Sequence, residues 1–285
     1  TQVIDMLLQD MERAGVTVWL GCALGDVRRD GDGFTVETAR GPQVARAVVV
    51  ATGGKSIPKM GATGYGYRVA ESCGVRLIET RPALVPLTFA EQELEWMRPL
   101  AGLSVPGRVS AGRQGFDEAM LFTHRGLSGP AILQVSSYWR EGEAISVDLL
   151  PGRDPGAELR AAKAAQGKAA LRTVLGRWLP ERLARHLETE AGVTAPMAEL
   201  PGAVLDRLAA TLCDWRLVPV GSEGYRTAEV TLGGVDTRAL NGRTMEAAAV
   251  PGLYFVGEVV DVTGWLGGYN FQWAWSSGWA AGQSL

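Results

Sequence analysis

Two periods of hydrophobic residues alternate along this chain, and together they predict an α/β protein. Short β-branched and apolar runs bounded by Gly, Asp or Pro predict strands at 16–19, 33–38, 48–50, 228–235 and 253–256. Apolar residues three and four positions apart predict helices at 3–11, 64–74 and 269–282. The first of these helices mixes acidic with apolar positions, so we expect an amphipathic helix of the core rather than a signal peptide.

The middle of the chain follows a different pattern and predicts an insertion. Residues 86–150 favour strands, whereas residues 151–215 are rich in Ala, Leu and Arg with helical periodicity broken by prolines. We therefore expect an inserted domain at 86–225, mainly β at first and then helical. The flanking parts, 1–85 and 226–285, would form one discontinuous α/β domain.

Two glycine-rich segments follow predicted strands and carry the candidate chemistry. Small residues at 51–54 leave room for a cofactor over the carboxyl edge of a sheet. After the strand at 253–256 come Glu258, a glycine loop and a helix start. A carboxylate accepts hydrogen bonds from ribityl hydroxyls, glycines admit a flat ring, and a helix N-terminus offers free N–H groups. This order suits a flavin; the alternative is a strand, a tight loop and a core helix without a ligand.

Four segments also resemble a known family, the FAD-dependent oxidoreductases of the aminoacetone oxidase or BaiN-like type. They are Ala51–Gly54 with Gly61–Tyr67, Arg81–Leu87, Leu121–Pro130, and the run from Gly257 to Ala274. The resemblance implies a discontinuous FAD/NAD(P)-binding Rossmann-like domain with an inserted β-barrel-like part and a helical part. The flavin contacts that it implies are Thr52, Gly53, Gly54, Gly257, Glu258, Asp261, Gly267, Gly268, Tyr269 and Asn270.

The chain departs from that family in two places. The family begins with a strand, a Gly-x-Gly-x-x-Gly turn and a helix that hold the FAD pyrophosphate, and this N-terminal unit is missing here. Many members also carry a smaller polar stretch with Pro where this chain has Thr263–Leu266. We expect the large indole of Trp265 to reshape the rim or roof of the flavin site.

Some of these candidates have a plain structural alternative. Glu258 could be a surface carboxylate, and Asp261 could cap the N–H groups of its own loop. His124 is a candidate proton donor to a substrate, or a loop histidine bonded to backbone. His186 lies in an Arg- and Glu-rich helical stretch and is expected to be solvated. The aromatic residues of the last helix are expected to pack in the core.

Composition narrows the functional classes. The net charge of −3 argues against nucleic acid as a main partner, and no apolar run is long enough to span a membrane. Three scattered cysteines and two histidines indicate neither a disulfide framework nor a metal site, so a cytoplasmic location is the default. A serine hydrolase is unsupported because Gly-x-Ser-x-Gly is absent.

The resulting hypothesis is an FAD-dependent oxidoreductase. Hydride would pass at flavin N5 to or from a small organic substrate held between the flavin and the inserted domain, with NAD(P)H considered as an electron donor. The alternative is a non-catalytic fragment or pseudoenzyme that cannot hold FAD because the pyrophosphate-binding turn is absent. Substrate, direction of the reaction and oligomeric state are left open by the sequence.

Overall fold

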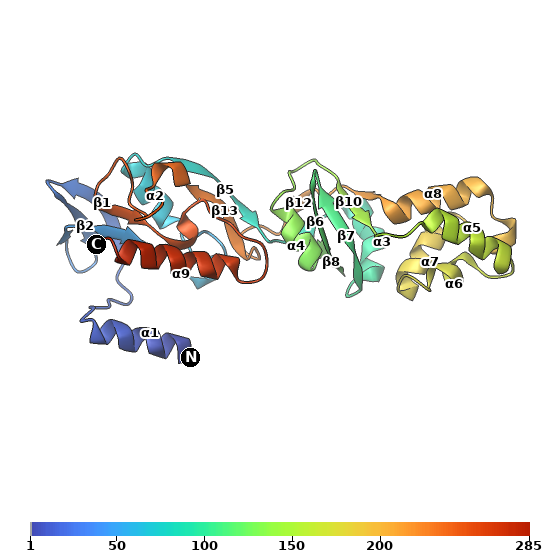
Figure 1. Cartoon of the computed structure of the whole chain (residues 1–285), viewed down its shortest axis with the longest axis horizontal. Coiled ribbons are helices and arrows are strands. Elements are labelled where there is room, and N and C mark those ends of the chain that lie inside the picture. The colour runs from blue at the N-terminus through green and yellow to red at the C-terminus, as the bar shows by residue number, and fades with distance from the viewer. Residues whose placement is uncertain (1) are drawn as a thin grey trace.

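The computed structural model describes residues 2–285, in which an α/β part, an antiparallel sheet and a helical part follow one another in a row (Figure 1). In the α/β part, the Asp-Gly-Asp-Gly turn at 30–33 joins two antiparallel strands, because glycine takes the left-handed conformation that a tight hairpin needs (Gly31 φ 60°). A third strand completes this small sheet. Its strands are β1 (Leu24–Asp30), β2 (Gly33–Thr38) and β3 (Gln43–Ala45).

A parallel strand pair joins the segment before the insertion to the segment after it. β4 (Val48–Val50) lies beside β14 (Leu253–Phe255), with Val50 opposite Phe255. Parallel strands have their carboxyl ends at the same edge, so Ala51 and Val256 emerge side by side. Next to this pair lie a two-stranded antiparallel sheet and two helices. These are β5 (Leu77–Ala83), β13 (Val230–Val235), α2 (Tyr65–Ser72) and α9 (Tyr269–Gly282).

The inserted sheet is open, so the expectation of a β-barrel-like part is wrong. Its seven antiparallel strands run in the order β11-β10-β7-β8-β9-β6-β12, and the edge strands β11 and β12 do not pair with each other. The edge strands are only three and two residues long, too short to close a barrel by hydrogen bonding. The bounds are β6 (Leu87–Thr88), β7 (Ser104–Ala111), β8 (Gln114–Thr123), β9 (Gly126–Ser128), β10 (Ile145–Asp148), β11 (Trp215–Leu217) and β12 (Gly221–Ser222).

The sheet and the helices of the insertion share one hydrophobic core. The cluster of buried apolar residues begins at Leu87 in β6, ends at Leu217 in β11, and includes residues from both parts. Pro180 and Pro201 immediately precede α7 and α8, where a proline has no helical N–H to lose. The helices are α3 (Glu91–Met97), α4 (Pro130–Ser136), α5 (Pro155–Ala165), α6 (Leu171–Leu175), α7 (Glu181–Glu190) and α8 (Gly202–Cys213).

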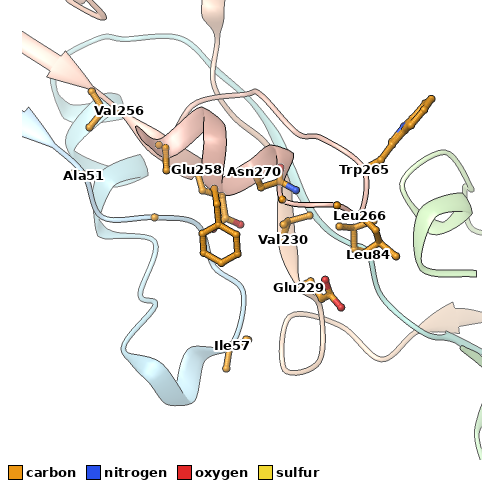
Figure 2. A pocket seen from close by; sticks show the side chains of 16 residues that line it. Ala51, Ile57, Leu84, Glu229, Val230, Val256, Glu258, Trp265, Leu266 and Asn270 are labelled. Atoms are coloured by element: carbon orange, nitrogen blue, oxygen red, sulfur yellow. The ribbon is translucent and has the colours of Figure 1, made fainter. Parts of the chain in front are cut away.

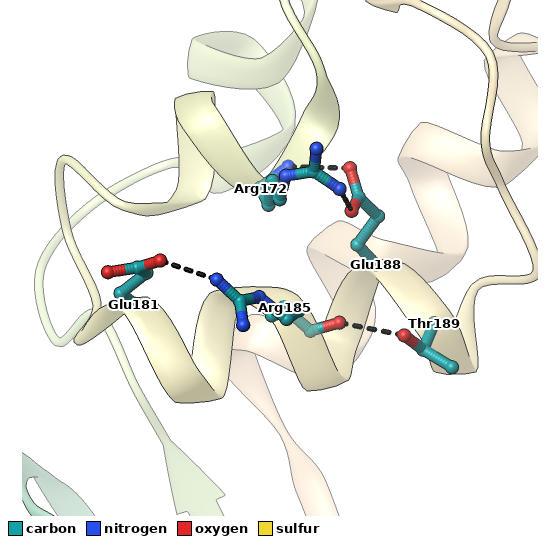
Figure 3. A network of polar contacts seen from close by, with 5 residues as sticks. All are labelled: Arg172, Glu181, Arg185, Glu188 and Thr189. Atoms are coloured by element: carbon teal, nitrogen blue, oxygen red, sulfur yellow. Dashed lines mark hydrogen bonds and ion pairs between the residues drawn. The ribbon is translucent and has the colours of Figure 1, made fainter.

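Charged residues of the helical part are held in local pairs (Figure 3). The Glu188 carboxylate, 8% exposed, accepts hydrogen bonds from the backbone N–H and the guanidinium of Arg172, each at 3.0 Å, and ties α7 to the start of α6. Arg185 pairs with Glu181 one turn away on α7. The arginines drawn in this network are therefore neutralised by neighbours, as expected for structural ion pairs on helix surfaces.

The first helix was expected to pack in the core, and it does not. α1 (Gln2–Arg13) has no buried residue and lies apart from the other elements (Figure 1). The predicted strand at 16–19 is also wrong, because this segment has no regular structure and Trp19 is 37% exposed. An apolar stripe identifies the face that a helix would bury, but not the element that it would meet.

The aromatic residues of α9 are likewise mostly outside the core. Trp273 packs against the α/β core, whereas Phe271, Trp275 and Trp279 are 77%, 52% and 70% exposed. None of the helices among residues 2–285 is long and apolar enough to cross a membrane.

Candidate functional site

A cavity of about 490 Å³ lies where the two glycine-rich segments meet (Figure 2). Residues from near 51–57 line one side and residues from near 256–274 line another. Leu84, just after β5, and Glu229 and Val230, where β13 begins, complete the lining. The parallel pairing of β4 with β14 brings the first two segments together. Its lining is Ala51, Gly53, Ile57, Leu84, Glu229, Val230, Val256, Gly257, Glu258, Trp265, Leu266, Gly267, Gly268, Asn270, Phe271 and Ala274.

Glycines with left-handed backbone conformations shape this cavity. Gly53 and Gly268 have φ angles of 69° and 90°, and a Cβ built on either would meet no atom within 4 Å. A Cβ built on Gly257 would also have space, because the nearest atom would be the Ala274 Cβ at 3.8 Å. Glycine thus satisfies the backbone conformation at these positions and leaves the peptide surface accessible to a flat ligand.

Glu258 both lines the cavity and holds its wall together. It lies in a short 3-10 helix, Gly257–Val259, directly after β14. Its Oε1 accepts a hydrogen bond of 2.6 Å from the backbone N–H of Thr231, a buried residue in β13. Burial, and then the nearby Glu258 carboxylate, raise the pKa of Tyr67, so the phenol stays protonated. The Glu258 carboxylate therefore lines the cavity and also holds β13 in place through its hydrogen bond with Thr231.

Gly54 lies behind Glu258 and is required by close packing. A Cβ at this position would lie 2.4 Å from Thr231 Oγ1 and 2.8 Å from Glu258 Oε1. The Thr231 hydroxyl in turn accepts a hydrogen bond of 2.8 Å from the backbone N–H of Lys55. The second glycine of the pair thus allows the loop after β4 to approach β13.

The loop before α9 is closed by a single side chain. Asn270 accepts a hydrogen bond from the Gly264 N–H at 2.8 Å and donates one to the Gly264 carbonyl at 3.1 Å. The N-cap residue of α9 is Gly268, which has no side chain to make a capping hydrogen bond. Its first N–H groups are thus available at the cavity, where they favour negative charge.

The predicted contact residues divide into two groups. Six of them line the cavity: Gly53, Gly257, Glu258, Gly267, Gly268 and Asn270. Four do not: Thr52, Gly54, Asp261 and Tyr269. Of these four, Gly54 contacts Glu258 as described, and Tyr269 is 61% exposed beside Gly267.

Asp261 is held in the loop that follows Glu258. Its N–H donates to the Val235 carbonyl at 2.9 Å. Burial and the neighbouring Asp236 carboxylate raise the pKa of Asp261, while a hydrogen bond from the Gly233 backbone opposes that shift. These contacts tie Asp261 to β13 and not to the N–H groups of its own loop, and its role toward a flavin stays a prediction.

His124 lies outside the cavity. It occupies the turn between β8 and β9, where its side chain is exposed. In this arrangement His124 is not brought together with Glu258 or the glycine loops, so its catalytic role also stays a prediction. Among residues 2–285, no group of three or more His, Cys, Asp or Glu side chains is placed to hold a metal ion.

Several lining residues were not anticipated. Leu84, Val230 and Leu266 belong to one small apolar cluster at the neck between the α/β part and the insertion. Thr231, which binds Glu258, could have been suspected from its place in the strand before Gly233-Gly234. No sequence pattern predicts Leu84, Val230 and Leu266 as lining residues. A leucine or valine becomes part of a site only through the tertiary contacts of its segment.

The residues fit a flavin. The cavity combines an open glycine backbone, apolar walls, the two carboxylates of Glu229 and Glu258, and an uncapped helix N-terminus. These are the groups that a flat ring with a polar edge and a hydroxylated chain require. Its volume is also within the range of small-molecule sites.

The match of a Rossmann-domain family model along the chain makes this an α/β protein of the Rossmann type. The chain belongs to the HI0933-like family, because the family model for the HI0933-like protein Rossmann domain matches residues 1–284.

Curated relatives are similar along the whole chain. A protein of Escherichia coli named ribosomal RNA dihydrouridine synthase is 48% identical over 286 residues, covering 100% of this chain and 72% of the relative. A protein of the same name from Haemophilus influenzae is 41% identical, with the same coverage. The 3-dehydro-bile acid delta(4,6)-reductase of Clostridium scindens is 29% identical, covering 99% of this chain and 72% of the relative.

Proposed function

We propose that this protein is an FAD-dependent oxidoreductase that reduces a carbon–carbon double bond conjugated to a carbonyl group, and that its substrate is the uracil ring of a uridine in ribosomal RNA. The names of the relatives support this reaction class. Dihydrouridine is uridine with its C5–C6 double bond reduced, and a delta(4,6)-reductase acts on double bonds conjugated to a 3-oxo group. Both reactions add hydrogen to an electron-poor alkene.

The observation that carries the proposal is the convergence of the segments near 53 and near 258 on one cavity. When bound, FAD supplies the two-electron chemistry. The chain's own groups would bind and orient the flavin: the backbone at Gly53 and Gly257 would hold the ring, and the N-terminus of α9 would stabilise negative charge on it. Leu84, Val230 and Leu266 provide an apolar wall that excludes water.

A uridine substrate changes the expectation about partners. The expectation of no nucleic acid came from the net charge of −3, which describes the whole chain and not one surface. A base must leave its stack to enter a cavity of this size, and single-stranded or loop nucleotides do so at least cost. Substrate access would then depend on the local RNA structure more than on long-range attraction.

The test is an assay on RNA that lacks the modification. Flavin-loaded full-length protein, with NADH or NADPH as reductant, is incubated with ribosomal RNA from cells lacking the gene, and nucleosides are quantified by mass spectrometry. We expect dihydrouridine to form. Failure on RNA together with reduction of a 3-oxo-4,6-diene steroid would move the substrate to the bile acid class, and failure on both would overturn the proposal.

Two glycine variants provide the matched control for this assay. Gly268→Ala adds a Cβ at the cavity, whereas Gly112→Ala adds one in the β7–β8 turn; both glycines have positive φ angles and no atom within 4 Å of the added Cβ. The backbone cost is therefore similar, about 1–2 kcal/mol. We expect Gly268→Ala alone to lose flavin and activity.

A further inference from the structure

The loop between Glu258 and α9 is attached to the inserted domain by two consecutive side chains. Trp265 Nε1 donates a hydrogen bond of 2.6 Å to the Tyr138 hydroxyl, just after α4. The indole also meets Phe116 of β8 edge-on, with ring centroids 5.2 Å apart at 89°. Figure 2 shows Trp265 directed away from Glu258, towards the green ribbon of the inserted domain.

Leu266 extends this contact through the neck. It packs in the apolar cluster with Leu84 and with Leu133 of α4. Next to Leu84, the buried Val85 N–H donates to Ser136 Oγ at 3.0 Å, which fastens the same helix to the neck. Leu84 has a left-handed φ of 47°, a strained conformation for leucine that surrounding packing must maintain.

The other end of the loop is fixed to the flavin side. Asn270 holds Gly264 by two hydrogen bonds, and Gly267 and Gly268 line the cavity. The short segment 264–268 is thus bound to α9 through its ends and to the insertion through Trp265 and Leu266. Any movement of the insertion relative to the α/β part must displace the backbone that lines the cavity.

We propose that Trp265 is a positioning residue: its contact with Tyr138 and Phe116 sets how the inserted domain closes over the substrate side of the cavity. The inference rests on the proposed function insofar as a substrate binds between the flavin and the insertion. Trp265 and Tyr138 are 45% and 40% exposed. Breaking an exposed contact of this kind changes domain position without unfolding the protein.

Tyr138→Phe tests the contact by removing only the hydroxyl. Loss of one neutral hydrogen bond corresponds to about a two- to tenfold change in an equilibrium constant. We expect KM for the substrate to rise by that factor, with flavin content and kcat unchanged. Tyr65→Phe is the control, because Tyr65 also donates one phenolic hydrogen bond, of 2.7 Å to the Gly25 carbonyl, far from the insertion.

Hydrogen exchange tests the same contact without any substrate. In Tyr138→Phe, peptides covering 262–268 should exchange about two to ten times faster. Trp265→Phe keeps an aromatic ring but removes the N–H that donates to Tyr138. Exchange at 262–268 in the double variant should therefore be no faster than in Trp265→Phe alone. The exchange measurement needs no activity on RNA. It can therefore test the Trp265–Tyr138 contact even if the proposed function proves wrong.

Two results would overturn the inference. One is unchanged exchange at 262–268 in both Tyr138→Phe and Trp265→Phe. The other is a KM effect of Tyr138→Phe no larger than that of Tyr65→Phe.

Discussion

At the scale of single residues, Glu258 satisfies two requirements at once. Its Oε1 binds the N–H of Thr231, and the side chain lines the cavity. Gly54 is small because Thr231 and Glu258 occupy the space where its Cβ would be. A glycine beside a carboxylate thus reflects internal packing here. The family resemblance implied Gly54 as a flavin contact, and in the structure Gly54 packs against Thr231 and Glu258 and does not line the cavity.

Replacing Glu258 should separate these two roles. In Glu258→Ala the buried Thr231 N–H loses its acceptor, which costs about 1–3 kcal/mol of folding free energy, and FAD retention should fall more than tenfold. Glu258→Gln keeps an acceptor oxygen, so it should restore most of the stability but less of the FAD affinity. Denaturant unfolding and flavin titration measure the two effects; wild-type FAD affinity in Glu258→Ala would remove the residue from the site.

At the scale of elements, helix α7 is more deeply integrated than its charged sequence suggests. His186 was expected to be solvated, but its ring stacks on Trp96 of α3, with centroids 4.6 Å apart and an interplanar angle of 11°. Trp215 of β11 packs against the same Trp96 ring. The helical part and the sheet are therefore joined by an aromatic stack that no single segment reveals.

This stack should make stability depend on pH. Burial lowers the pKa of His186 below its ordinary value of 6.5, although Glu190, 3.6 Å away, opposes the shift. The unfolded chain then binds more protons than the folded one as pH falls through 6.5, so the folded state loses stability below that pH and regains it above. His186→Phe keeps a flat ring and should flatten the dependence of unfolding free energy on pH between about 5 and 7. An identical slope in both proteins would contradict this account.

At the scale of the whole molecule, the insertion has the features of an independent unit. All members of its hydrophobic cluster lie between Leu87 and Leu217. Its entry and exit lie side by side, because β6 pairs with β12. Adjacent ends and a self-contained core are typical of domains inserted into another domain.

Excision tests the predicted domain boundaries directly. A fragment covering 86–225 should fold alone and unfold in a single cooperative transition, since it keeps the whole cluster and the paired ends. Thermal unfolding by circular dichroism and the dispersion of amide NMR signals measure this. A fragment without a cooperative transition would show that the insertion depends on the α/β part.

Local patterns predicted much of the site, because its main parts are local. The strand at 48–50, the small residues after it, and the strand–Glu258–glycine loop–helix order can all be read from short windows of sequence. Each depends on backbone conformation or strand periodicity, which neighbouring residues largely decide. Of the ten contact residues that the family resemblance implied, six line this one cavity.

Long-range packing decided the rest. The sequence alone contained the apolar stripes of α1 and α9, the alternation of the inserted strands and the indole at 265, because these are properties of short segments. Only the tertiary structure decided whether the sheet closed and which stripe was buried. It also decided that Trp265 meets Tyr138, 127 residues away along the chain. Such contacts follow from the complementary shapes of distant surfaces, and no local period encodes them.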